Sequence, residues 1–259
     1  MPTPHTMPTP LHDDIKRKVS ETYGKVATSG MSGCGCSCSP SRGYSQADLD
    51  SVPKGADLGL GSGNPLAIAD IQAGETVMDL GSGGGIDCFL AAGKVGDDGL
   101  VIGIDMTPEM VSRARANARE SGCSNIDFRL GEIEHLPVAD ASVDVIISNC
   151  VINLSPDKTS VFREAFRVLK PGGRLAISDV VTTAELPEEV RGDLAQYAAC
   201  VSGAASINEL KNILAEAGFE GIRIQAKSGE RDIPETWKPG SNISDYTVSA
   251  TVEAMKPVN

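Results

Sequence analysis

Short apolar runs recur along the chain from residue 76 onward, and amphipathic segments separate them. The runs are typical of buried strands, and the segments between them are typical of helices. The expected strands are Thr76–Leu80, Leu100–Ile104, Ile126–Leu130, Val143–Ser148 and Arg174–Ser178. Strands that alternate with helices imply right-handed crossovers and a parallel sheet. The pattern therefore predicts an α/β fold, a Rossmann-like and mostly parallel sheet with helices on both faces.

Capping residues predict where the helices begin and end. Thr107 is a good N-cap, Pro108 suits the first helical position, and Gly122 stops the helix that follows. Ser206 and Glu209 have the spacing of a capping box at the start of another helix. The other expected helix limits are about Lys94 for the helix after the first strand, 155–169, and Ala217 for the helix that starts at Ser206.

Four regions are expected along the chain. Residues 1–65 form an N-terminal tail, a helix and a cysteine-rich loop, and 66–182 form a cofactor-binding core. Residues 183–205, which include an acidic helix, are read as a helical insertion over the site. Residues 206–259 complete the sheet with strands near 222–226 and 246–252.

The N-terminal region holds three different kinds of segment. Residues 1–10 repeat MPTP and contain too little apolar surface to fold, so a disordered tail is expected. Residues 14–28 carry apolar positions at helical spacing. The glycine- and serine-rich stretch SGMSGCGCSCSPSRG predicts a loop that presents the thiols of Cys34, Cys36 and Cys38.

Charge and composition exclude some partners. The net charge of −12 repels phosphate backbones, and an aromatic content of 4% offers few surfaces for stacking bases, so nucleic acid is not expected. No run reaches the roughly 18 apolar residues of a membrane span, and no secretory signal is evident at the start. The expected location is the cytoplasm, where the seven cysteines remain reduced thiols.

The turn after the first strand is the strongest motif in the chain. Asp79 precedes Gly81, Gly83 and Gly85, and missing Cβ atoms allow a tight turn and close approach of a ligand. A dinucleotide fingerprint requires a small third residue where this chain has Ile86, so the motif favours S-adenosylmethionine over NAD. Asp105, at the tip of the second strand, is placed to bind ribose hydroxyls.

Four segments carry a resemblance to a known family. They read VMDLGSGGGIDCF, IGIDMTPEMVSRARANA, GEIEHLPVADASVDVIISNCVINLSPDK and FREAFRVLKPGGRLAISDV. The chain resembles the microbial arsenite S-adenosylmethionine methyltransferases from about residue 23 to residue 256, and ISNCVINLS and QYAACVSGA are specific to that family. The resemblance implies transfer of methyl groups to thiol-bound trivalent arsenic, with mono- and dimethylated arsenicals as products and arsenic detoxification as the role.

The resemblance also implies two sets of site residues. Cys150 and Cys200 match the family's arsenic ligands, and a disulfide between Cys88 and one N-terminal cysteine, reduced by thioredoxin or glutathione, is implied during turnover. Ser62 stands where relatives often have cysteine. Of the cofactor residues, Asp105 would bind the ribose, while Met106 and Ile133 would flank the adenine. The full cofactor set is Asp79, Gly81, Ser82, Gly83, Asp105, Met106, Glu132, Ile133 and Asn149.

The chemistry of the residues agrees with this resemblance. Trivalent arsenic is thiophilic, so thiolates are its expected ligands. Cys88 follows the glycine turn, Cys150 follows the fourth strand and Cys200 ends the inserted helix, so the three thiols could converge near the cofactor. The start of a helix would also favour the thiolate of Cys88. Arsenic attacks through its lone pair, which requires positioning and no general base.

Three other interpretations stay open. Any of these cysteines could be a small core residue, which is the preferred interpretation of Cys123. The chain could be a small-molecule carbon or oxygen methyltransferase, for example one that acts on a quinone-like acceptor. It could also bind or sense metalloids without turnover.

Overall fold

A computed structural model describes residues 11–29, 43–226 and 246–258. The helices are α1 (His12–Ser29), α2 (Gln46–Ser51), α3 (Ile86–Val95), α4 (Pro108–Ser121), α5 (Lys158–Val168), α6 (Glu188–Arg191), α7 (Leu194–Ala198) and α8 (Ile207–Ala217), with the 3-10 turns η1 (Pro65–Ala67) and η2 (Ile152–Leu154). The strands are β1 (Thr76–Leu80), β2 (Leu100–Asp105), β3 (Ile126–Leu130), β4 (Val143–Asn149), β5 (Leu169–Thr182), β6 (Glu220–Ala226) and β7 (Thr247–Met255).

The described strands form one seven-stranded sheet in the order β3-β2-β1-β4-β5-β7-β6. The strands from β3 to β5 run parallel, whereas β7 pairs antiparallel with both β5 and β6. The prediction of a mostly parallel sheet is confirmed. Because β1 lies between β2 and β4, the direction of winding reverses at β1, and ligands in such sheets bind at the carboxyl ends of the strands beside this point.

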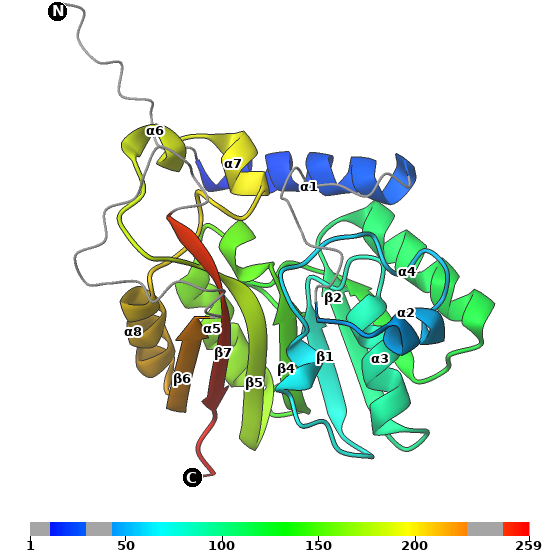
Figure 1. The fold of residues 1–259 in the computed structure, drawn as a ribbon. Coiled ribbons are helices and arrows are strands. Elements are labelled where there is room, and N and C mark those ends of the chain that lie inside the picture. The colour runs from blue at the N-terminus through cyan, green and yellow to red at the C-terminus, as the bar shows by residue number, and fades with distance from the viewer. Residues whose placement is uncertain (1–10, 30–42, 227–245, 259) are drawn as a thin grey trace, which may run out of the picture.

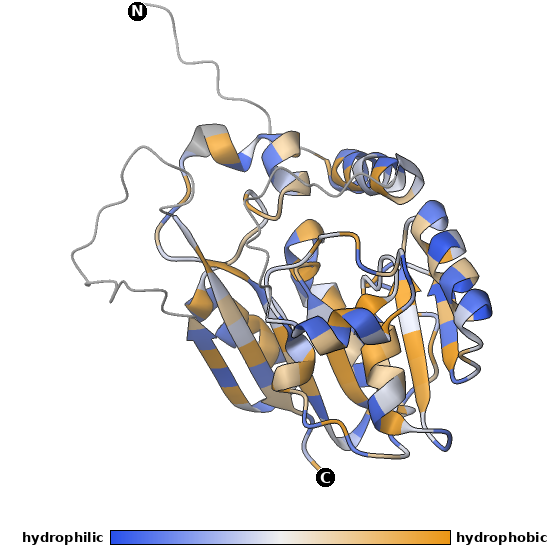
Figure 2. Cartoon of the chain, turned by 45° about the vertical axis from the view of Figure 1, so that its right-hand side comes forward, coloured by the Kyte–Doolittle hydropathy of each residue, from blue (hydrophilic) through white to orange (hydrophobic). Residues whose placement is uncertain are grey.

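Helices cover both faces of the sheet (Figure 1). Met78 and Leu80 of β1 pack in one core with α5 and α8, whereas Val77, which points to the opposite face, packs in a second core with α3 and α4. Alternate residues of the same strand are therefore buried on both sides, which explains why the strands read as nearly continuous apolar runs. Figure 2 shows the central strands as mostly hydrophobic.

The segment between β5 and α8 differs from the prediction of one acidic helix. It forms two short helices, α6 and α7, because the Asp193 carboxylate accepts hydrogen bonds from the Ala195 and Gln196 amides and so begins a new helix. Helix α7 lies beside α1, at the end of the sheet where the glycine turn follows β1 (Figure 1). The segment lies at this end of the sheet as two helices, and its part as a cover of the site stays a prediction.

Helix α5 and strand β5 also depart from their predicted bounds. The helix begins at Lys158 because Asp157 is its N-cap, while the Ser155 hydroxyl donates to the Glu134 carboxylate at 2.6 Å. The stretch 170–173, which lies between the predicted helix 155–169 and the predicted strand that starts at Arg174, belongs to β5. Gly172 and Gly173 pair with the backbone of Lys256. Helix α2 was not predicted, and Thr107 caps α4 without a side-chain hydrogen bond.

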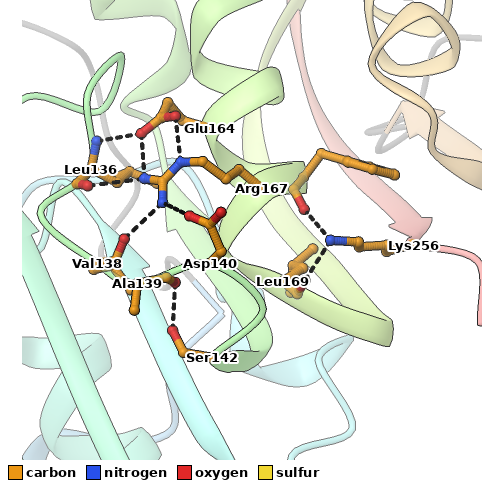
Figure 3. A network of polar contacts seen from close by, with 10 residues as sticks. Leu136, Val138, Ala139, Asp140, Ser142, Glu164, Arg167, Leu169 and Lys256 are labelled. Carbon is orange, nitrogen blue, oxygen red and sulfur yellow. Dashed lines mark hydrogen bonds and ion pairs between the residues drawn. The ribbon is translucent and has the colours of Figure 1, made fainter.

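Arg167 of α5 joins the helix to the loop before β4 (Figure 3). Its guanidinium donates to both Glu164 carboxylate oxygens at 2.7 and 2.6 Å and to the Asp140 carboxylate at 2.6 Å. It also donates to the carbonyl oxygens of Leu136 and Val138 at 3.1 and 2.9 Å. The Glu164 hydrogen bonds raise the pKa of Arg167 further above its ordinary value, so the group stays charged.

We expect Arg167→Met to lower the free energy of unfolding by about 2 kcal/mol, because the substitution removes charge-assisted hydrogen bonds and leaves two carbonyl oxygens without a donor. Arg163→Met, on the exposed face of the same helix, is the matched control and should change this free energy by no more than about 0.5 kcal/mol. Urea denaturation measures both. Equal losses of unfolding free energy in the two variants would show that the Arg167 hydrogen bonds do not stabilise the fold.

Candidate functional site

A cavity of about 770 Å³ opens at the carboxyl ends of β1, β2 and β4. Its walls come from the glycine turn, α1, the 56–63 loop, η2 and the residues that follow α7. Residues far apart in sequence therefore meet where a parallel sheet places its ligands. The sequence-predicted residues that line it are Asp79, Gly81, Ser82, Gly83, Asp105, Met106, Ile133, Asn149, Cys150 and Cys200.

The glycine turn is held open toward this cavity. The amides of Gly81 and Ser82 both donate to the Ile104 carbonyl oxygen, at 2.8 and 2.9 Å. Gly81 has φ +73°, and a Cβ there would lie 2.3 Å from the Val151 side chain. A Cβ on Gly83 would meet nothing within 4 Å. The turn therefore requires glycine at position 81 for steric reasons and leaves space for a ligand at position 83.

Asp105 lies at the end of β2, as predicted, and connects two backbone segments. One carboxylate oxygen accepts the Gly83 amide at 3.0 Å and the other accepts the Thr107 amide at 2.8 Å. Burial raises the pKa of Asp105 from its ordinary value. Because each carboxylate oxygen has two lone pairs, the group can still accept hydrogen bonds from a pair of ribose hydroxyls.

The other predicted cofactor residues divide into three groups. Met106 and Ile133 line the cavity as apolar side chains. Glu132 does not line it and instead forms an ion pair with Lys16 of α1 at 2.7 Å. Asp79 is 2% exposed at the base of the cavity, where burial raises the pKa of its carboxyl group well above the ordinary value. The two carboxylate oxygens of Asp105, the open glycine turn and the apolar side chains of Met106 and Ile133 together fit a nucleoside such as that of S-adenosylmethionine.

Asn149 uses its side-chain amide to hold other protein segments. Its Oδ1 accepts the Ser62 amide at 2.9 Å, and its Nδ2 donates to the Gly63 carbonyl oxygen at 2.7 Å and to the Tyr44 hydroxyl at 2.9 Å. The 61–63 loop is thereby fixed against the end of β4. Asn149 lines the cavity, but its side-chain amide forms hydrogen bonds with protein groups, so its predicted part in cofactor binding stays a prediction.

Cys150 and Cys200 are brought together in this cavity. The Cys200 thiol donates to the Cys150 carbonyl oxygen at 3.1 Å, and the Cys150 amide donates to the Ser178 carbonyl oxygen at 2.8 Å. Both cysteines adopt positive φ, +59° and +63°, a conformation that L-residues rarely take. Backbone strain of this kind gathers at functional sites. The neighbouring Cys200 thiol and burial raise the pKa of Cys150 well above its ordinary value.

Cys88 does not join the other two thiols, and here the prediction of convergence is wrong. Its side chain is 0% exposed in the core between α3 and the sheet and does not line the cavity. The thiol donates to the Asp79 carboxylate at 3.4 Å. Burial and the adjacent Asp79 raise the pKa of Cys88 well above its ordinary value, so the expected stabilisation of its thiolate by the start of α3 is also wrong. Cys34, Cys36 and Cys38 lie outside the described residues.

Sequence reasoning missed one residue that lines the cavity, Tyr23, and two that hold its walls in place, Tyr44 and Asp179. Tyr23, Tyr44 and Asp179 come from segments distant in sequence, and no local motif identifies them. Asp179 is 3% exposed, and its carboxylate accepts the Ile152 amide at 3.0 Å and the Asn153 side-chain amide at 2.9 Å. It therefore fixes η2, the turn that directly follows Cys150.

A pH dependence follows from this buried acid. Burial raises the pKa of Asp179 from 3.8 to about 6. A carboxyl group whose folded-state pKa lies above its unfolded-state value stabilises the fold fully below the unfolded pKa and loses that contribution as the pH rises through the folded pKa. Relative to Asp179→Asn, the wild type should therefore lose about 2 kcal/mol of unfolding free energy between pH 4 and pH 7.

Urea denaturation of both proteins across this range measures the difference. Asp157→Asn is a control of opposite sign, because hydrogen bonds from Ser160 lower the pKa of Asp157, whose contribution is lost as the pH falls. A difference between the wild type and Asp179→Asn that stays constant with pH would contradict the assignment.

The described residues hold no group of three or more His, Cys, Asp or Glu side chains placed to bind a metal ion. None of the helices in the described ranges is long and apolar enough to cross a membrane.

Comparisons with known proteins agree with this geometry. Residues 71–218 match a family described as a methyltransferase domain. An arsenite methyltransferase of Halobacterium salinarum is 49% identical over 95% of this chain and 67% of its own length. The human arsenite methyltransferase is 37% identical over 80% of this chain and 58% of its own length, so this chain spans little more than half of that relative.

A solved structure is also similar. The crystal structure of an arsenic(III) S-adenosylmethionine methyltransferase from Chlamydomonas reinhardtii superposes with a TM-score of 0.64 at 34% identity, over 83% of this chain and 71% of the other. On the sequence match, the fold and the site together, the chain belongs to the arsenite methyltransferase family, whose members depend on S-adenosylmethionine.

Proposed function

We propose that this chain transfers methyl groups from S-adenosylmethionine to thiol-bound trivalent arsenic, giving mono- and dimethylated arsenicals. The observation that carries the proposal is the pair Cys150 and Cys200, two strained cysteines that face the same cavity as the glycine turn. A soft thiophilic element is the substrate that a pair of thiols would select. Arsenite and its thiol complexes are the proposed forms of delivery.

In this proposal the residues of the chain position arsenic and the cofactor relative to each other. The thiols of Cys150 and Cys200 each pass a proton to a hydroxyl group of arsenite, which leaves as water, and the two sulfurs hold arsenic with its lone pair free. Asp105 and the glycine turn hold the cofactor. S-adenosylmethionine, when bound, supplies an electrophilic methyl group. Because arsenic attacks the methyl group through its lone pair, the transfer step removes no proton and requires no general base. His12 and His135, the two histidines in the described residues, do not line the cavity, which agrees with this chemistry.

Each transfer would form an arsenic–carbon bond with the arsenic lone pair while the bond between the methyl group and the sulfonium sulfur breaks and S-adenosylhomocysteine leaves. The transfer raises arsenic from the trivalent to the pentavalent state. Two electrons must then return before the next transfer, and we propose that a thiol reductant, thioredoxin or glutathione, supplies them by becoming a disulfide. Cys34, Cys36 and Cys38 remain candidates for an intermediate thiol. The buried position of Cys88 argues against its direct part in that exchange. A cytoplasmic location, where such reductants are present, fits this proposal.

The test is turnover with methyl-labelled S-adenosylmethionine, arsenite and a thiol reductant, with the products separated by chromatography. The proposal predicts labelled mono- and dimethylated arsenic. A carbon or oxygen methyltransferase would label a quinone-like acceptor and leave arsenite unmethylated, and a metalloid sensor would bind arsenite with no labelled product. Either of these results would overturn the proposal.

A further inference from the structure

Tyr23 of α1 lies against the two cysteines of the cavity. It lines the cavity together with Cys150 and Cys200, and all three belong to one cluster of packed side chains. The Tyr23 hydroxyl donates to the carbonyl oxygen of Ala198 at 3.2 Å. Ala198 is the last residue of α7, two positions before Cys200. The hydroxyl therefore contacts the turn that presents one of the thiols.

Helix α1 is fixed in a way that keeps this hydroxyl in place. Ile15 and Val19, two turns and one turn before Tyr23, are 4% and 3% exposed in the same cluster. On the cavity side of the helix, the Lys16 ammonium pairs with Glu132 at 2.7 Å and with Glu134 at 3.6 Å. Apolar burial packs α1 against residues 183–205, the segment with α6 and α7 that is called the cap from here on. Two ion pairs hold α1 to the loop after β3, so Tyr23 extends from a rigid element.

The Tyr23 hydroxyl is a permanent donor. Burial, followed by the neighbouring Cys200, raises the pKa of Tyr23 well above its ordinary value, so the proton stays on the oxygen. The Tyr23 and Cys200 side chains belong to the same packed cluster and line the same cavity. A sulfur that carries negative charge is a stronger acceptor than a backbone carbonyl oxygen, because hydrogen bonds to ionised groups are about twice as strong as neutral ones.

We propose that Tyr23 is a positioning residue for arsenic binding, whose hydroxyl orients Cys200 and donates a hydrogen bond to its sulfur as that sulfur gives up its proton to bind trivalent arsenic. The inference rests on the proposed function for the identity of the bound element. It adds a role for the N-terminal helix, which brings a hydroxyl donor to a site otherwise built from the sheet and the cap. No local motif in the sequence indicates this residue.

Tyr197 provides a matched control on the same cap. It is a tyrosine of the same cluster, and its hydroxyl also donates to a backbone carbonyl oxygen, that of Ser155 at 3.3 Å. It does not line the cavity. Tyr23→Phe and Tyr197→Phe therefore each remove one hydroxyl and one hydrogen bond to a carbonyl oxygen from the same packed cluster, and they differ in whether the hydroxyl faces the thiols.

The test measures arsenite binding and turnover in both variants. For Tyr23→Phe we expect the KM for arsenite to rise about tenfold, with the KM for S-adenosylmethionine and the Tm close to wild type. Tyr197→Phe should leave the KM for arsenite unchanged. A KM for arsenite within twofold of wild type in Tyr23→Phe, or an equal rise in both variants, would overturn the role of Tyr23.

A second readout does not depend on turnover. Arsenite titration followed by the near-ultraviolet absorption of arsenic–sulfur bonds reports binding in the absence of S-adenosylmethionine. Weaker binding in Tyr23→Phe than in Tyr197→Phe would support the inference even in a protein that binds arsenite without methylating it, and equal binding would overturn it. Absence of labelled arsenic products from the wild type would count against the proposed function alone.

Discussion

Cys150→Ser and Cys200→Ser are each expected to lower the rate of arsenite methylation by at least about a hundredfold, because loss of one ligand leaves arsenic out of line with the methyl group. A serine oxygen is a hard donor and does not replace a thiolate toward a soft element. The measurement is the initial rate with saturating S-adenosylmethionine and a thiol reductant, together with arsenic retained by the desalted protein.

Cys123→Ser is the control for this pair of substitutions. Cys123 is half-buried between α4 and β3 and does not line the cavity, so the variant should keep the wild-type rate. Binding of S-adenosylmethionine should be retained in all three variants, which separates loss of arsenic chemistry from loss of fold. Wild-type rates in Cys150→Ser and Cys200→Ser would show that the two thiols do not bind the substrate.

Asp105→Ala is expected to weaken S-adenosylmethionine binding by between tenfold and a hundredfold, because a charge-assisted hydrogen bond contributes about 1.5–3 kcal/mol. The same substitution leaves the amides of Gly83 and Thr107 without their acceptor, so the glycine turn should also lose order. Isothermal titration calorimetry with S-adenosylmethionine measures the affinity.

The matched control for Asp105 is Asp127→Ala. Asp127 is an exposed carboxylate of the adjacent strand β3 that pairs with Arg129 at 2.8 Å and lies outside the cavity. Its loss should leave the affinity for S-adenosylmethionine unchanged. An unaltered affinity in Asp105→Ala would place the ribose somewhere other than the tip of β2.

The central strands could be predicted closely from sequence, and the reason is their burial on both faces. A strand that must be apolar on each side, such as Thr76–Leu80, reads as a continuous run bounded by polar turns, and its ends are marked in the sequence. The bounds of the other elements depend on contacts with segments that are distant in sequence. Strand β5 begins at Leu169 and includes Gly172 and Gly173 because the C-terminal strand provides hydrogen-bond partners for them.

The candidate site could be predicted only as far as motifs reach. The glycine turn and Asp105 could be predicted from their places at the ends of strands, whereas Cys150 and Cys200 were predicted as arsenic ligands because they match those of the family that the chain resembles. Cys88 was placed in the site because it follows the glycine turn closely, but the helical rotation at the third residue of α3 turns its side chain into the core. Nearness along a helix does not specify a face.

Tyr23 and Asp179 are residues that no sequence motif could identify. Their partners are 175 and 27 positions away, Ala198 for Tyr23 and Ile152 for Asp179, so no window of sequence contains either contact. The positive φ of Cys150 and Cys200 was equally hidden, because cysteine has no preference for that conformation. Only the folded arrangement shows that the two thiols are held in strained positions.

The most direct test of arsenic methylation is a single turnover with equimolar protein, arsenite and S-adenosylmethionine that carries a trideuterated methyl group. Mass spectrometry of the quenched mixture, after chromatography, identifies which atom received the methyl group. The account predicts monomethylated arsenic that bears all three deuterium atoms, formed at the rate at which the cofactor is consumed. Bound cofactor, bound arsenite and no deuterated arsenic would contradict it.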